Sequence, residues 1–207
     1  MTVLSAVFQG QRYLGGILTG FFQPTFSQIA PQIEQFPSRL GYVDIDRIQL
    51  LDDRQRLSLA EVLEQALQLL SPRIRSEQVE VFRQVPAEAA VSGDAIRLEQ
   101  VLINLLHNAL DAMAERPQRR LRILCRRVGD AWQLSVADNG GGIASEHLDQ
   151  VFEPFFTTKP VGQGLGLGLA VSYGIVRDMG GTLEVSNDEQ GAVFTLTLPA
   201  AEVHAAE

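Results

Sequence analysis

The chain has 207 residues, of which 45% are hydrophobic, and a formal net charge of −8. This length predicts one domain of ordinary size with an extension, and the hydrophobic content excludes a disordered chain. The negative charge argues against a nucleic-acid-binding surface, which is usually basic, but it permits a phosphate ligand held by backbone N–H groups and one cation. The one cysteine, Cys125, excludes a disulfide within the chain and favours a reducing, cytoplasmic setting.

Residues 1–57 form an N-terminal segment whose fold the sequence does not define. Glycine and proline interrupt every apolar run there before a helical or strand period develops. The run from Tyr13 to Ile33 carries no charge, but glutamines and prolines interrupt it, so it is a poor transmembrane candidate. Its aromatic side chains need burial, and three sites remain open: a second subunit, a neighbouring domain, and the domain that follows.

Residues 58–199 are predicted to form one domain, because regular periods begin at Ser58. Ser58 to Glu61 is a capping-box pattern before a helix, and residues 79–85 alternate as a half-buried strand does. Residues 90–91 are a candidate second, short strand. Gly93-Asp94 opens a long helix that ends before Pro117.

The second half of this domain is predicted to consist mainly of strands. Residues 121–128 and 132–137 alternate on either side of Gly129-Asp130, which indicates a hairpin. A short helical piece near residues 145–151, a helix over residues 167–179, and strands over residues 182–186 and 192–198 follow; residues 200–207 are expected to be a flexible tail. This order predicts an α+β fold, a two-layer α/β sandwich with helices covering one face of a mixed sheet.

The long helix carries the first candidate site. Asn104 and Asn108 lie four residues apart, so they share one helix face. An amide oxygen suits Mg²⁺, which usually takes few protein ligands together with phosphate and water. Two amides that only face solvent are the alternative, and His107 between them is interpreted as a neighbour and not as a catalyst.

The second candidate site is Asp138 with Gly140 and Gly142. A carboxylate at the end of a strand can accept a hydrogen bond from an exocyclic amine such as that of adenine, and glycines leave room for a base. A tight turn after a strand would give the same pattern.

The third candidate site spans residues 152–168. An aromatic cluster over residues 152–156 precedes a loop with glycine at every second position, and Lys159 is the nearby cation. Backbone N–H groups at the start of the next helix would face phosphate oxygens, with the helix dipole behind them. The loop is neither a GxxxxGK[ST] phosphate loop nor a dinucleotide fingerprint, and its interleaved leucines argue against a flexible linker.

Together, in this order, the three motifs resemble the catalytic and ATP-binding domain of bacterial sensor histidine kinases, of the GHKL superfamily. Residues 104–109 resemble the asparagine box of that family, residues 138–143 and 164–169 its two glycine boxes, and residues 152–156 its phenylalanine box. The amino-acid sequence of these motifs is most similar to that of the nitrogen-regulation and dicarboxylate-sensing kinases. The resemblance covers residues 58–199 and implies the Bergerat fold, with ATP and Mg²⁺ as cofactors.

The resemblance also implies roles for individual residues. Asn108 would be the Mg²⁺ ligand and Asp138 the adenine contact, and the catalytic residues would be Asn104, Asn108 and Lys159. The implied ATP-binding residues are Asn104, Asn108, Asp111, Asp138, Gly140, Gly142, Ile143, Phe155, Thr158, Lys159, Gly162, Gly164, Leu165, Gly166, Leu167, Gly168 and Thr195.

The implied activity is that of an ATP-dependent protein histidine kinase in two-component signal transduction. The kinase would donate the γ-phosphoryl group of ATP to a histidine, for relay to an aspartate of a response-regulator receiver domain. The resemblance also implies that this chain is the cytosolic part of a membrane-anchored bacterial sensor, in contact with the membrane only through that parent protein. The parent protein would be a homodimer formed through its N-terminal region. A nucleotide-binding or ATPase module of the GHKL type without kinase activity remains the alternative.

Asn104 favours phosphoryl transfer over hydrolysis. Relatives that hydrolyse ATP, such as gyrase and the ninety-kilodalton heat-shock chaperone, have a glutamate one helical turn before the metal-binding asparagine. An amide at this position cannot take a proton from water, so we expect tight ATP binding with little ATPase activity.

No histidine of this chain has the sequence context of a phosphate acceptor. The chain contains His107, His147 and His204, and in the family the acceptor lies in a two-helix dimerisation domain before the ATP domain. Residues 1–57 are interpreted as a variant or remnant of that region or as a linker, where a chance match places Thr19 at the histidine position. Self-phosphorylation of this chain alone is therefore not expected.

Overall fold

The structure is a computed structural model that describes residues 55–159 and 165–201. Three parts of the sequence analysis concern residues outside this range: the interpretation of residues 1–54, the assignment of Gly162 and Gly164 to the ATP site, and the end of the tail with His204. Within them, no helix has both the length and the apolar character needed to cross a membrane.

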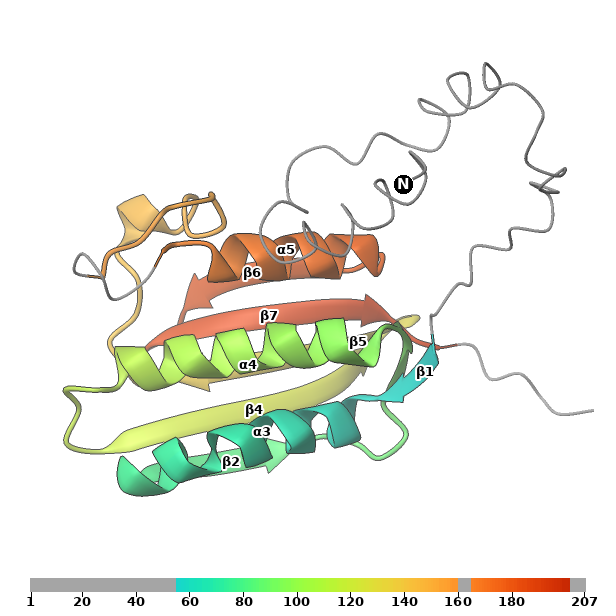
Figure 1. Cartoon of the computed structure of the whole chain (residues 1–207), viewed down its shortest axis with the longest axis horizontal. Coiled ribbons are helices and arrows are strands. Elements are labelled where there is room, and N and C mark those ends of the chain that lie inside the picture. Colours follow the sequence, from blue (N-terminus) through green and yellow to red (C-terminus); the bar gives the residue numbers. More distant parts are fainter. Residues whose placement is uncertain (1–54, 160–164, 202–207) are drawn as a thin grey trace, which may run out of the picture. The chain divides into compact units, whose positions relative to one another are not determined.

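Five strands form one mixed sheet in the order β2-β4-β5-β7-β6 (Figure 1). β2 and β4 run parallel, and the other neighbouring pairs are antiparallel. The predicted hairpin at Gly129-Asp130 is the β4–β5 connection. The strands are β2 (Val79–Gln84), β4 (Arg119–Val128), β5 (Ala131–Asp138), β6 (Thr182–Asn187) and β7 (Ala192–Pro199).

Three helices cover one face of this sheet, which confirms the predicted two-layer α+β architecture (Figure 1). They are α3 (Leu59–Ser76), α4 (Ala95–Ala112) and α5 (Gly168–Asp178), and a short 3₁₀ helix, η2 (Ser145–His147), stands where the short helical piece was predicted. The capping residues act as expected: the Ser58 hydroxyl accepts from the Glu61 N–H, and the Asp94 carboxylate accepts from the N–H groups of Ile96 and Arg97.

The core lies between the helices and the sheet, with α4 at its centre. The apolar face of α4 is completely buried and consists of Leu98, Val101, Leu102, Leu105, Leu106, Ala109 and Leu110. Every second residue of the central strands points into this core, and the residues between them, except the buried Ala137, are polar or partly exposed. α4 is therefore held on its apolar side, which leaves its polar stripe to face the loops.

The structure extends the predicted domain slightly at both ends. β1 (Gln55–Ser58) pairs antiparallel with β3 (Ala90–Gly93), so the domain begins three residues before the predicted boundary at Ser58. At the other end, the N–H groups of Ala200 and Ala201 donate to the carbonyls of Asp130 and Ala90. The predicted tail therefore begins too early, because these two residues are bonded into the fold.

Candidate nucleotide-binding site

One stripe of α4 gathers the motifs that the sequence singled out. Asn104 and Asn108 lie one helical turn apart. A Cβ atom added at Gly168 would lie 2.3 Å from Asn104 Oδ1, which shows how closely the start of α5 approaches this amide. Lys159 Nζ lies 3.5 Å from Asn108 Oδ1. The asparagine motif therefore meets both the loop after residue 156 and the second glycine motif.

The first glycine motif meets the same helix one turn further on. A Cβ atom added at Gly140 would lie 2.6 Å from the Cβ atom and the carbonyl oxygen of Ala112. Only glycine allows the chain after β5 to pass this close to α4. Positions 104, 108 and 112 of one helix therefore mark the places where three separate segments come together.

The Asn104 amide is anchored to α5 by a side chain that the sequence analysis missed. Its Nδ2 donates to the Ser172 hydroxyl at 3.0 Å, and Ser172 is only 1% exposed. Ser172 is the one polar residue on the buried side of α5, one turn after Gly168, and this position was the signal available in the sequence. Asn104 thus links α4 to the first turns of α5.

Asp138 lies at the end of β5 and is almost fully buried. Its Oδ1 accepts from the backbone N–H groups of Gly140 at 2.8 Å and Ala192 at 3.4 Å. Burial raises the pKa of Asp138, and these two hydrogen bonds oppose that shift. Both bonds fall on Oδ1, so within the described residues Oδ2 remains available to accept a hydrogen bond from a ligand.

A second missed residue, Asn187, shapes the loop after Asp138. The Ile143 N–H donates to Asn187 Oδ1 at 2.9 Å, and Asn187 Nδ2 donates to the Ile143 carbonyl at 2.7 Å. Gly142 has φ +83°, and a Cβ atom there would lie 2.8 Å from Asn187 Oδ1. Gly142 is therefore required both by its conformation and by the space that Asn187 takes.

The aromatic motif is joined to the start of α5 through the backbone. The Phe155 N–H donates to the Gly166 carbonyl at 2.9 Å, and both residues have positive φ, +68° and +65°. The Phe156 ring packs against His147 and the Phe152 ring against Tyr173, each with ring centroids 5.3 Å apart. The loop between residues 156 and 166 is thus held at both ends.

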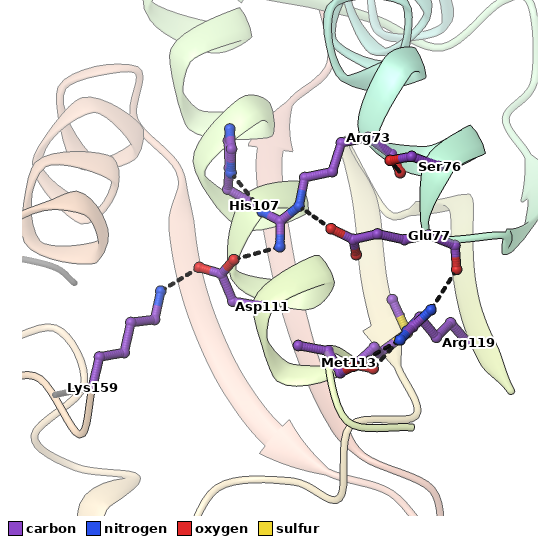
Figure 2. A network of polar contacts seen from close by, with 9 residues as sticks. Arg73, Ser76, Glu77, His107, Asp111, Met113, Arg119 and Lys159 are labelled. Atoms are coloured by element: carbon purple, nitrogen blue, oxygen red, sulfur yellow. Dashed lines mark hydrogen bonds and ion pairs between the residues drawn. The ribbon is translucent and has the colours of Figure 1, made fainter. Parts of the chain in front are cut away.

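An ionic chain runs from this loop across α4 to α3 (Figure 2). Lys159 Nζ lies 2.5 Å from Asp111 Oδ2, and Arg73 Nη2 lies 2.7 Å from Asp111 Oδ1. Burial acts to raise the pKa of Asp111, but the hydrogen bonds from Lys159 and Arg73 outweigh it and lower that pKa below its usual value. Asp111 is therefore a fixed anion that shares Lys159 with Asn108.

The donor set fits Mg²⁺ only when phosphate and water complete the shell. The described residues contain no cluster of three or more His, Cys, Asp or Glu side chains that could hold a metal ion. Asn108 Oδ1 is a hard oxygen donor that Lys159 Nζ approaches only to 3.5 Å, whereas the two oxygens of Asp111 are paired with cations at 2.5 and 2.7 Å. One protein ligand together with phosphate oxygens is the way Mg²⁺ is usually held beside a nucleotide.

One predicted site residue, Thr195, stands apart from this constellation. Thr195 pairs with Ser135 in the β5–β7 register, and its neighbours Phe194 and Leu196 point into the core. The alternation of a strand therefore turns Thr195 to the face opposite the helices, and its assignment to the site is corrected. Thr158 is exposed, and Leu165 and the Phe155 ring are 78% and 71% exposed.

Comparison with known proteins gives consistent matches. The profile of the family described as histidine kinase-, DNA gyrase B- and HSP90-like ATPase matches residues 93–202. The two-component sensor PprA of Pseudomonas aeruginosa is 48% identical over 146 residues, which are 67% of this chain and 16% of PprA. The C4-dicarboxylate transport sensor protein DctB of Rhizobium meliloti is 42% identical over 142 residues, 68% of this chain and 22% of DctB.

A solved structure supports the same relationship. The catalytic domain of the histidine kinase ThkA superposes with a TM-score of 0.64 at 32% identity, and the match covers 70% of this chain and 95% of that domain. The chain thus matches nearly all of an isolated catalytic domain but spans less than a quarter of either sensor.

Proposed function

Because the chain belongs to the family of histidine kinase-, DNA gyrase B- and HSP90-like ATPases, we propose that it binds ATP and Mg²⁺ as the catalytic domain of a two-component sensor histidine kinase. Its reaction is attack of a histidine ring nitrogen on the γ-phosphorus of ATP. An N–P bond forms, the bond to the bridging oxygen breaks, ADP leaves, and the ring proton passes to solvent. The phosphoryl group then moves to an aspartate of a response-regulator receiver domain.

The α4 stripe is the observation that carries this proposal. It brings Asn108, Lys159 and the start of α5 together at one end and the loop after Asp138 at the other. We assign Asp138 to the exocyclic amine of adenine, through its available Oδ2. The triphosphate then extends along α4 toward the start of α5, where Asn108 supplies an oxygen to Mg²⁺.

The start of α5 supports the placement of the phosphates. Its N-cap residue, Leu167, makes no side-chain capping hydrogen bond. The first N–H groups of a helix have no partner within the helix, and the helix dipole favours an anion there. Lys159 adds one cation on the other side of Asn108.

Transfer is favoured over hydrolysis by the chemistry of Asn104. An amide cannot act as a general base toward water, and this amide donates to Ser172. A histidine acceptor is already a nucleophile and needs no such base. The expected consequence is tight binding of ATP with little steady-state hydrolysis.

A nucleotide-binding module without kinase activity is the second candidate, and the positions of the described histidines favour it. His107 lies on α4 beside Arg73, and the His147 ring packs on Phe156. Neither belongs to a pair of helices of the kind that carries an acceptor histidine. If the protein is a kinase, neither histidine of the described residues is placed as its acceptor, and we propose that the acceptor belongs to a domain outside residues 55–201 or to another chain.

A transfer assay separates the two candidates. The 207-residue chain is mixed with ATP labelled at the γ-phosphate and with a purified two-helix acceptor domain of a dicarboxylate-type sensor. The kinase proposal expects acid-labile label on the acceptor domain, none on this chain alone, and loss of the label with Asn108→Ala. Binding of ATP without transfer to an acceptor would leave the binding module as the function, and strong ATP hydrolysis that depends on Asn104 would contradict the role assigned to this residue.

We also propose, from the sensors that the chain resembles, that the full-length protein is a homodimer attached to a membrane through segments outside residues 55–201. Light scattering and membrane fractionation of the full-length protein test this assembly separately from the chemistry of the site.

A further inference from the structure

We propose that Arg73 on α3 is a positioning residue of the phosphate end of the site, which acts through Asp111 to fix Lys159 beside Asn108. This inference rests on the proposed function and adds a helix that none of the three sequence motifs includes. It follows from the geometry of the ionic chain in Figure 2.

Asp111 bridges the two cations with separate oxygens. Oδ1 contacts Arg73 Nη2 at 2.7 Å, and Oδ2 contacts Lys159 Nζ at 2.5 Å. The same Lys159 nitrogen lies 3.5 Å from Asn108 Oδ1, the oxygen assigned to Mg²⁺. The carboxylate therefore sets the distance between the guanidinium of α3 and the cation of the loop.

Arg73 is itself held on three sides. Its Nε donates to Glu77 Oε1 at 2.6 Å, and its Nη1 lies 3.1 Å from His107 Nδ1, in addition to the contact with Asp111. A planar guanidinium that is engaged by three groups has one orientation, which a flexible lysine could not maintain. Arg73 thus transmits a fixed position to Asp111.

The balance of charge explains why Arg73 matters for a phosphate ligand. Asp111 alone would neutralise Lys159 and compete with the triphosphate for it. Because Arg73 shares the carboxylate, Lys159 keeps part of its attraction for an anion. The side chains of Arg73, Asp111 and Lys159 are 28%, 34% and 35% exposed, so solvent screens these interactions only in part.

The test is a double-mutant cycle on nucleotide affinity. Dissociation constants of ATP and ADP, each with Mg²⁺, are measured by calorimetry for the 207-residue chain and for Arg73→Gln, Asp111→Asn and the double variant. We expect Arg73→Gln to weaken ATP binding by about fivefold to tenfold and ADP binding by less, because the ionic contacts of Arg73, Asp111 and Lys159 act at the terminal phosphate. The double variant should bind ATP no more weakly than Asp111→Asn.

Two further variants guard against a purely structural effect. Arg83 forms an ion pair with Glu64 of α3 away from this chain of contacts, so Arg83→Gln should leave the ratio of ATP to ADP affinity unchanged. Arg73→Lys keeps a positive charge but loses the planar fork, and we expect an intermediate ATP affinity. Urea denaturation of each variant shows whether it is folded.

The outcomes separate this inference from the proposed function. A wild-type chain that binds neither nucleotide would overturn both. Wild-type binding of ATP together with an unchanged affinity in Arg73→Gln would overturn the inference alone. Equal losses for ATP and ADP in Arg73→Gln, or effects that add to those of Asp111→Asn, would also overturn it, because Arg73 would then act through the fold and not through Asp111.

Discussion

At the scale of single residues, burial decides which polar side chains are chemically active. Cys125 on β4 is 7% exposed and Asp138 on β5 is 4% exposed, but their surroundings differ. The thiol lies in the hydrophobic core, whereas the carboxylate has two backbone N–H partners and one available oxygen. Similar burial therefore makes Cys125 inert but leaves Asp138 with one oxygen that can accept a further hydrogen bond.

Cys125 should resist alkylation in the folded protein. Burial raises the pKa of its thiol to about 11 from an ordinary value of 9.0, and the nearby carboxylate of Glu88 adds to the shift. At pH 8 this leaves about one hundredfold less of the reactive thiolate than an ordinary cysteine has. Iodoacetamide labelling followed by mass spectrometry should be slow in buffer and fast in urea, and equally fast labelling in both would contradict this burial.

Asp111 should make stability depend on pH in the acid range. Its pKa is lowered in the folded state, so the folded protein binds fewer protons than the unfolded chain at a pH near the ordinary value of 3.8. The stability that Asp111 contributes is therefore complete above that value and is lost as the pH falls through the lowered pKa. Compared by urea denaturation, Asp111→Asn should lose less stability than the wild type on acidification, and parallel losses would contradict the assigned ion pairs.

At the scale of elements, the ends of the helices are where the sequence and the tertiary structure combine. α3 and α4 begin at side-chain caps that could be read from the sequence, because Ser58 and Asp94 are local signals. Both helices end near one arginine whose contacts with them could not be predicted from a local sequence pattern. Arg119 of β4 donates to the carbonyls of Glu77, Met113 and Ala114, and so joins the two helix ends (Figure 2).

Arg119→Ala should destabilise the domain by about 2 kcal/mol. The change removes three hydrogen bonds from a charged donor and a cation that faces two helix C-termini. The matched control is Arg126→Ala on the same strand, because Arg126 is exposed and bonds only the side chain of Gln133 among the described residues. Urea denaturation should show a lower midpoint for Arg119→Ala than for the control, and equal midpoints would contradict this role.

How far the site could be predicted follows from the range of each interaction. The three motifs were readable because each is a short local pattern. In the structure, Lys159 and the glycine motif after Asp138 both lie against α4, the helix that carries Asn108. The hydrogen-bond partners of Ser172 and Asn187 were not readable, since they lie 68 and 44 residues away along the chain. Thr195 was a different error, because the alternation of its strand already placed it opposite the buried residues.

At the scale of the whole molecule, one helix, α4, organises both the hydrophobic core and the candidate site. The apolar face of α4 forms the centre of the core, and the polar stripe of the same helix meets the loop after β5, the loop that carries Lys159 and the start of α5. Any nucleotide bound along this stripe would contact the loop after β5, the loop before α5 and α4 together. Binding should therefore stabilise the entire domain and not one loop.

The most direct measurement is a calorimetric titration of the 207-residue chain with a non-hydrolysable ATP analogue and Mg²⁺. We expect one site for each chain and a loss of about tenfold to one hundredfold in affinity for Asp138→Ala, because a hydrogen bond to a buried carboxylate is removed. Asp130→Ala, in the exposed β4–β5 turn, serves as the control and should bind as the wild type does. Absence of binding by the wild type, or unchanged binding by Asp138→Ala, would contradict the assignment of this site.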